Sequence, residues 1–265
     1  MKRRFFSCVI LIVVSAFCQA HEFWLQPRKF LYTIGEEMKV DFKAGENFEG
    51  EPWDFKKHGI EKLMLHHQLK STDLRMMVKP EAKDKLSVKL NEEGNYLLVM
   101  QSKNDFLELD AEKFNTHLKE DGLEDTYEQR KKSNTLDQPS REFYARFVKL
   151  LVQVGSKQDD TYKKVAGLRI EIIPDKNPYS LKSGDYLQCM IIYEGKPSPH
   201  QLVKVWNKIN RTTFEQDIYT EKDGTIKFPI SAPGIWMVST VKMIPSEKAG
   251  ADWQSMWGSL VFGIL

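Results

Sequence analysis

The chain has 265 residues, of which 39 are basic, 37 are acidic and 41% are hydrophobic. This near-neutral balance excludes the strongly basic surface that proteins use to bind nucleic acid or anionic membranes. The three cysteines are too few for a disulfide-stapled fold, so apolar burial must stabilise the protein.

Residues 1–20 have the pattern of a signal peptide. Basic residues come first, an apolar run follows at 5–17, and Ala20 closes a cleavage site with small residues. The apolar run is shorter than the roughly 20 residues of a membrane-spanning helix, and no later segment is apolar for long enough. We therefore expect a soluble, periplasmic protein that begins at His21; an uncleaved N-terminal anchor is the alternative.

Removal of this leader changes the charge and the cysteine count. The mature chain would carry 36 basic and 37 acidic residues, which predicts no nucleic-acid partner. Cys189 would be the single remaining cysteine. In the run 187–191 it falls on the same alternating face as apolar residues, so we expect a buried, unpaired cysteine in a strand.

Two similar patterns recur along the chain. Residues 86–90 and 226–230 alternate between apolar and polar side chains, and each run is followed four residues later by Gly94 or Gly234 and a second apolar run. Alternation with a period of two is typical of strands that bury one face. The glycine between two such runs predicts a tight reversal, so we expect a similar hairpin in each half.

A second echo supports an internal duplication. The glycine-acid turn and strand start at 33–38 resemble those at 182–187. We therefore predict a mainly β protein with two immunoglobulin-like β-sandwich domains. The expected first sandwich comprises residues 21–104 and is completed by a strand and linker at 141–164, and the second sandwich comprises residues 165–265.

A small helical insertion is expected at 105–140. Phe114 and Leu118 lie four residues apart on one helical face, and Gly122 suits a helix end. A second short helix is predicted from Leu123 to about residue 132. The insertion is interpreted as a lid, a partner surface or a cap over one sandwich.

The chemistry-bearing residues favour a metal site over a catalytic one. No nucleophile elbow, phosphate loop, dinucleotide fingerprint or zinc-protease helix occurs, so we predict no enzyme. After cleavage, the α-amine and the ring Nδ1 of His21 could chelate one ion, and Glu22 could add an oxygen. His66 and His67 are adjacent in a strand, so only one of them could face that site.

The tryptophans near the end of the chain admit two interpretations. Trp253 and Trp257 are predicted to be buried, since tryptophan covers a large apolar area, and a sugar or peptide groove is the alternative.

The mature chain resembles an exported bacterial family called domain of unknown function 4198. The resemblance rests on the mature start 21–25, Phe114, Leu118, Gly122, Leu123, Arg141, Tyr144, the run 149–155, the turn 195–197, Met243 and the closing block 251–255 with Trp257, Leu260 and Phe262. That family is similar to nickel-uptake accessory proteins and carries a NikM-like label. The resemblance implies metal handling, with the mature first histidine as a ligand.

Together these observations predict a periplasmic metal-binding accessory protein. Its cofactor would be a divalent transition metal, namely nickel, cobalt or copper. Its partner would be a metal-transport system or an envelope protein. The alternative is a non-catalytic interaction module that binds a cell-surface protein or a glycan.

Overall fold

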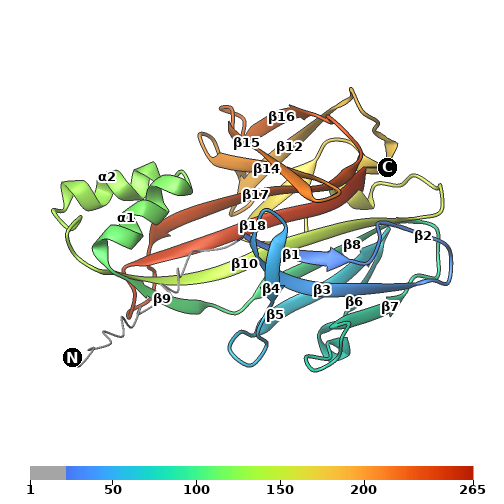
Figure 1. The fold of residues 1–265 in the computed structure, drawn as a ribbon, viewed down its shortest axis with the longest axis horizontal. Coiled ribbons are helices and arrows are strands. Elements are labelled where there is room, and N and C mark those ends of the chain that lie inside the picture. Colours follow the sequence, from blue (N-terminus) through green and yellow to red (C-terminus); the bar gives the residue numbers. More distant parts are fainter. Residues whose placement is uncertain (1–21, 265) are drawn as a thin grey trace, which may run out of the picture.

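The structure, a computed structural model, describes residues 22–264 and is built from three β-sheets and two short α-helices (Figure 1). A ten-stranded sheet runs through the molecule, and two four-stranded sheets pack against it. Three single-turn 3-10 helices lie in loops, at η1 (Arg75–Met77), η2 (Thr161–Lys163) and η3 (Pro178–Ser180). The protein is therefore mainly β and has the predicted β-sandwich class.

The ten-stranded sheet, here called the central sheet, has the order β15-β14-β17-β18-β10-β8-β5-β6, and β2 and β9 also pair with β10. Its strands are β2 (Leu31–Tyr32), β5 (Ile60–His67), β6 (Lys70–Asp73), β8 (Gly94–Ser102), β9 (Asp105–Leu109), β10 (Ser140–Val154), β14 (Leu202–Ile209), β15 (Thr212–Tyr219), β17 (Gly234–Pro245) and β18 (Trp253–Ile264).

The two outer sheets are sheet A, from the first half of the chain, and sheet C, from the second half. Sheet A contains β1 (Glu22–Pro27), β3 (Glu37–Glu46), β4 (Glu49–Pro52) and β7 (Leu86–Lys89). Sheet C contains β11 (Ile170–Pro174), β12 (Tyr186–Tyr193), β13 (Lys196–Pro197) and β16 (Thr225–Pro229).

The outer sheets cover opposite faces of the central sheet. In β8, Leu98 packs into the core under sheet A, whereas its neighbour Leu97 packs into the core under sheet C. In β10, Val148 and Phe147 divide between the same two cores. Since successive side chains of a strand point to opposite faces, the central strands are buried on both sides and the molecule has three layers.

A pseudo-two-fold arrangement explains this layout. β10 and β18 lie side by side and parallel, with residues 142–150 opposite 253–261. The strand order is mirrored on either side of this pair, with β8 and β5 beyond β10 and with β17 and β14 beyond β18. A half-turn about an axis along parallel strands preserves their direction and exchanges the faces of the sheet. The outer sheet of each half therefore lies on the opposite side.

The predicted repeat is present, but the expected hairpins are wrong. β7 pairs with β3 in sheet A, whereas β8 after Gly94 pairs with β5 and β10 in the central sheet. In the second half, β16 belongs to sheet C and β17 after Gly234 belongs to the central sheet. Each glycine is thus at a crossing between layers. Gly234 has a φ of 150°, and a Cβ there would lie 2.4 Å from the Lys208 carbonyl oxygen.

The two helices of the expected insertion are present, whereas its first residues, 105–109, form strand β9. Asp110 caps α1 (Ala111–Glu120) by accepting a hydrogen bond from the Lys113 amide, and α2 (Glu124–Lys132) follows after Gly122, whose φ is 65°. The pair lies at one end of the central sheet, at the left in Figure 1.

The helices cover Trp253 and Trp257, for which the sequence predicted burial but no packing partner. Along β18, Val261, Trp257 and Trp253 share one face. Val261 packs under sheet A, whereas both tryptophans pack with Phe114 and Leu118 of α1. The insertion therefore continues the cover of the central sheet beyond the end of sheet A, and the prediction that the tryptophans are buried is confirmed.

Two further expectations concern Cys189 and the lengths of the helices. Cys189 in β12 is fully buried, as its alternation predicted, and is a free cysteine. Between residues 22 and 264, none of the helices is long and apolar enough to cross a membrane.

Candidate functional site

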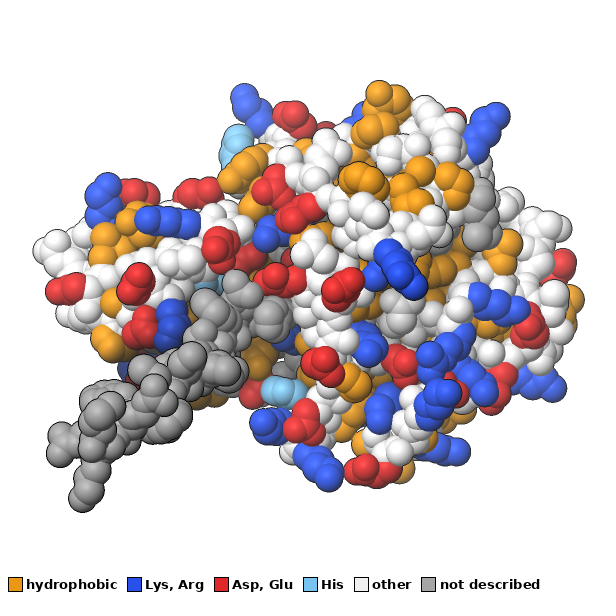
Figure 2. Space-filling model, in the orientation of Figure 1, with side chains coloured by type: hydrophobic (Ala, Val, Ile, Leu, Met, Phe, Trp, Pro, Cys, Tyr) orange, Lys and Arg blue, Asp and Glu red, His pale blue; other side chains and the backbone are white. Residues whose placement is uncertain are grey.

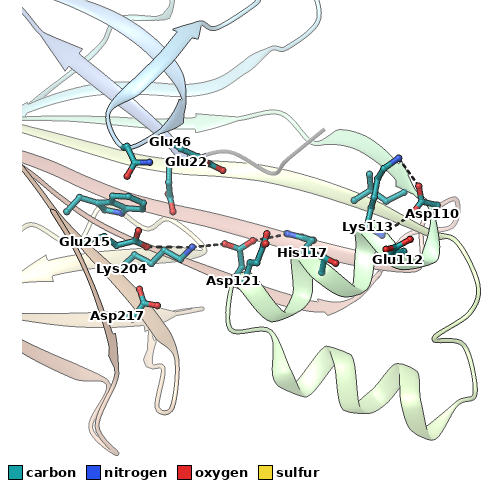
Figure 3. A pocket seen from close by; sticks show the side chains of 15 residues that line it. Glu22, Glu46, Asp110, Glu112, Lys113, His117, Asp121, Lys204, Glu215 and Asp217 are labelled. Carbon is teal, nitrogen blue, oxygen red and sulfur yellow. Dashed lines mark hydrogen bonds and ion pairs between the residues drawn. The ribbon is translucent and has the colours of Figure 1, made fainter. Parts of the chain in front are cut away.

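A cavity of about 830 Å³ lies between the helical insertion and the sheets. The start of β1, the turn between β3 and β4, helix α1, and strands β14 and β15 surround it (Figure 3). Its lining contains two lysines, one histidine and eight carboxylates, namely Glu22, Glu46, Asp110, Glu112, Glu120, Asp121, Glu215 and Asp217. Acidic side chains also gather between the helices and the strands on the face shown in Figure 2. The cavity is therefore a region of negative potential.

The pseudo-symmetry explains why a cavity forms here. Sheet C covers the other face of β14 and β15, so their cavity-facing side is left to α1 and to the end of sheet A. In the first half, the segment 155–168 with η2 packs against β8 and β11 instead. The cavity thus lies over the part of the central sheet that neither outer sheet covers.

Glu22 is the most deeply placed carboxylate of the cavity. It is the first residue of β1, it is 9% exposed, and its side chain points into the cavity (Figure 3). Burial, helped by the nearby Asp121 carboxylate, raises the pKa of Glu22 to about 7. Among residues 22–264 no cation lies within ion-pair distance of it, although Lys204 and a hydrogen bond with Ser239 favour its ionised form. Glu22 is therefore a buried carboxylate whose charge is only partly compensated.

His117 connects the helical insertion to the central sheet. Its Nδ1 lies 2.9 Å from Asp121 Oδ2, its Nε2 lies 3.5 Å from Glu142 Oε2, and its ring stacks on Trp257. Burial opposes protonation of the imidazole, but the two carboxylates outweigh it and raise the pKa of His117 to about 10. The protonated ring thus joins α1 to β10.

Lys204 continues this line of charges across the cavity. Its Nζ lies 3.2 Å from Asp121 and 4.0 Å from Glu215 (Figure 3). Asp121 therefore contacts a cation on each side, one from α1 and one from β14. The alternating charges hold the helix against the second half of the central sheet.

A polar group beneath His117 fixes Glu142. Ser255 of β18 donates a hydrogen bond to Glu142, and the indole of Trp257 donates to Ser255 Oγ at 3.0 Å. Glu142 is 1% exposed, and its Oε1 is hydrogen-bonded to Ser255 while its Oε2 lies within ion-pair distance of His117.

The structure separates the residues that the sequence suggested as metal ligands. Glu22 lines the cavity, whereas His21 lies outside the described residues. His66 Nδ1 contacts Ser71 Oγ at 2.7 Å on the sheet C face, and His67 Nδ1 contacts the Asn95 carbonyl at 2.9 Å. The expectation that His66 and His67 point to opposite faces is confirmed, because His67 stacks on Tyr96 of the sheet A core.

Neither histidine is close to Glu22. The carbonyl of the residue after Glu22 accepts a hydrogen bond from Ser259 of β18, which lies opposite Val148 of β10. His67 contacts the carbonyl of Asn95 in β8, which lies opposite Gln153 of β10. Val148 and Gln153 are five residues apart, or about 16 Å along the strand. Burial and nearby lysines also lower the pKa of His66 to about 4. The structure therefore brings Glu22 to the cavity without His66 or His67.

Sequence reasoning missed the other members of the site. His117 and Asp121 have the i, i+4 spacing that places side chains together on a helix, which was a usable signal. Glu142 and Lys204 come from distant strands, and no local pattern connects them to α1. Within residues 22–264, no group of three or more His, Cys, Asp or Glu side chains is arranged to hold a metal ion.

The fold and the cavity define a class of protein: a three-layer β-sandwich protein with an acidic cavity under a helical insertion. The chain belongs to the family described as "Domain of unknown function (DUF4198)", whose model matches residues 18–243. This family match confirms the resemblance found in the sequence.

Other comparisons give distant likenesses. No curated protein matches the chain. The D0–D1 domain of intimin has 11% identity and a TM-score of 0.19, covering 91% of this chain and 97% of that chain. A tetra-tandem repeat in the extending region of a large adhesion protein has 8% identity and a TM-score of 0.21, covering 92% and 49%. Three N-terminal domains of the bacteriophage RB49 highly immunogenic outer capsid protein have 7% identity and a TM-score of 0.22, covering 92% and 70%.

Proposed function

We propose that the protein is a non-catalytic, periplasmic accessory protein that binds a divalent transition metal, namely nickel, cobalt or copper. Its site would be formed at the mature N-terminus, where His21 supplies two nitrogen ligands and Glu22 supplies an oxygen. The protein would be exported by its signal peptide and would deliver the metal to a transport system or an envelope protein.

The observation that carries this proposal is the position of Glu22. β1 holds the residue after His21 in the acidic cavity, with its carboxylate buried and without an ion pair among the described residues. A divalent cation beside such a carboxylate would favour its ionised form and lower its pKa. The surrounding carboxylates would raise the local concentration of cations.

The donor chemistry fits a borderline transition metal. An α-amine and an imidazole nitrogen on one residue can close a chelate ring, and nitrogen ligands favour nickel and copper over magnesium or calcium. His67 does not belong to this site, because it lies about 16 Å along the strand from it, and His66 is on the opposite face of the central sheet. The proposal therefore gives the nitrogen ligands to His21 alone.

A non-catalytic interaction module remains the second hypothesis. It would use the same fold without a metal, and the buried first strand would then serve only to anchor the chain end. The two hypotheses differ in whether the processed protein binds a metal ion.

The test is a calorimetric titration of the processed protein with nickel, cobalt and copper, alongside His21→Ala and Glu22→Gln. We expect His21→Ala to lose most of the affinity and Glu22→Gln to lose a smaller part. His200→Ala is the control, because that histidine is exposed and does not line the cavity, and it should bind as the parent does. Equal affinity of His21→Ala and the parent would contradict the proposal.

A further inference from the structure

Strand β15 forms an open edge of the central sheet beside the cavity. It is the terminal strand in the sheet order, and among the strands of residues 22–264 it is paired only with β14. All of its eight residues are exposed or half-buried. The opposite edge strand, β6, has only four residues. A long edge strand is a template on which another extended chain can pair.

The direction of the main-chain groups along β15 follows from the residue after it. The Thr220 amide donates to the Gln201 carbonyl at 2.9 Å, so Thr220 directs its main chain toward β14. The register between β14 and β15 is regular from residue 212 to residue 219. In an antiparallel strand, residues whose amide and carbonyl groups face the paired strand alternate with residues whose groups face away from it. The amide and carbonyl groups of residues 213, 215, 217 and 219 therefore face away from β14.

These outward residues also present their side chains to the cavity. Glu215 and Asp217 line it, and Thr213 reaches the Asn47 carbonyl across its edge at 2.8 Å. In an antiparallel pair, residues directly opposite each other place their side chains on the same face, about 4.5–5.5 Å apart. A strand added to β15 would therefore place every second side chain against Glu215, Asp217 and the acidic cavity.

We propose that β15 is the docking site for an extended segment of a partner protein that carries basic residues at alternate positions. The open edge would bind the main chain of this segment, and the carboxylates would select its lysines or arginines. Opposite charges facing each other across strands stabilise the pair, whereas like charges destabilise it. A second copy of this chain would place acidic edge against acidic edge, so self-pairing is disfavoured.

This inference goes beyond metal binding and does not depend on it. The docked segment would lie along the cavity rim, next to the end of β1 that carries Glu22. A partner held there would be adjacent to the site at which a metal is proposed to bind. An accessory protein that transfers its cargo needs such proximity.

The test uses metal-free, processed protein and a synthetic peptide of the length of β15. The peptide alternates lysine with threonine or valine, so all lysines fall on one face of a strand. One control peptide has the same composition with its lysines in one block, and another has proline at its centre. We expect the alternating peptide to bind at least about tenfold more tightly than either control.

Two readouts separate strand pairing from simple charge attraction. Hydrogen exchange should show new protection of the amides of residues 213, 215, 217 and 219, whereas 214, 216 and 218 already bond to β14. The double variant Glu215→Gln with Asp217→Asn should weaken binding by about tenfold, or about 1.4 kcal/mol. The control Glu81→Gln with Asp137→Asn removes the same charge from exposed positions elsewhere and should leave binding unchanged.

Three results would overturn the inference. They are equal binding of the alternating and blocked peptides, peptide binding without protection of the outward amides of β15, and a concentration-dependent dimer formed through β15. Because the metal is removed throughout and His21→Ala should bind the peptide normally, failure of the metal proposal would leave this result unaffected.

Discussion

Lys149 of β10 and Glu171 of β11 form an ion pair of 2.5 Å with both side chains withdrawn from solvent. Burial lowers the pKa of Lys149, and the attraction to Glu171 opposes this change. The same carboxylate accepts hydrogen bonds from the amides of Ala166 and Leu168. The pair therefore fixes the first strand of the second half to the last strand of the first half.

We predict that Lys149→Met destabilises the protein by about 3–5 kcal/mol, because it leaves the Glu171 carboxylate buried without its cation. Adding Glu171→Gln should recover part of this loss. Urea unfolding of the parent, both single variants and the double variant measures the coupling energy. Additive losses would show that the two residues do not act as a pair.

The stability of the protein should depend on the protonation of Glu22. Its pKa is raised from 4.5 to about 7, so the native state binds a proton that the unfolded state releases between these values. The free energy of unfolding should therefore fall as pH rises from 4.5 to 7, by up to about 3 kcal/mol from this group. Glu22→Gln should remove this fall.

Chemical unfolding in chelator-containing buffers between pH 4.5 and 8 measures this effect. Glu112→Gln, at an exposed position of the same cavity, is the matched control and should keep the parent's pH dependence. Parallel stability curves for Glu22→Gln and the parent would contradict the assignment.

The contact between His117 and Glu142 should hold the helical insertion in place. The pKa of His117 is raised from 6.5 to about 10, so its contribution is complete below pH 6.5 and is lost as pH rises through 10. His117→Gln should cost about 3 kcal/mol near neutral pH, since Glu142 is left buried without a cation. The difference from the parent should shrink toward pH 10.

Limited trypsin digestion provides a local measurement of the same contact. Helices α1 and α2 contain several lysines, and cleavage there should accelerate in His117→Gln while the sandwiches remain resistant. A stability difference that stays constant up to pH 10 would show that the protonated ring is not responsible.

Cys189 should react slowly with thiol reagents in the native protein. Its side chain is fully buried under sheet C, so thiol reagents cannot reach it, and burial also raises the pKa of its thiol. Labelling should become fast in denaturant. Rapid labelling of the folded protein would mean that β12 opens or that the thiol lies at the surface.

Much of the fold follows from local patterns in the sequence. Alternation located β7, β8, β16 and β17, and the i, i+4 pair Phe114 and Leu118 located α1. The sequence did not show that the strands on either side of Gly94 belong to different sheets. A glycine between two alternating runs suits both a hairpin and a crossing between layers, and only the pairing of β7 with distant β3 decides between them.

The site was less predictable than the fold. Glu22 was singled out because it follows His21, and it does line the cavity. The side chains of His117, Glu142 and Lys204 lie close together because β10 and β18 pair in parallel, which places α1 over the end of the central sheet. This pairing joins segments more than 100 residues apart, and no spacing in the chain indicates it.

The most direct test of the proposed function compares two proteins that differ by one residue before His21. One begins at His21, and the other carries an additional alanine that moves the α-amine away from the imidazole. The proposal predicts that nickel, titrated by calorimetry, binds the processed protein at least about tenfold more tightly, or about 1.4 kcal/mol. Equal affinity of the two proteins would contradict a metal site built on the amine of His21.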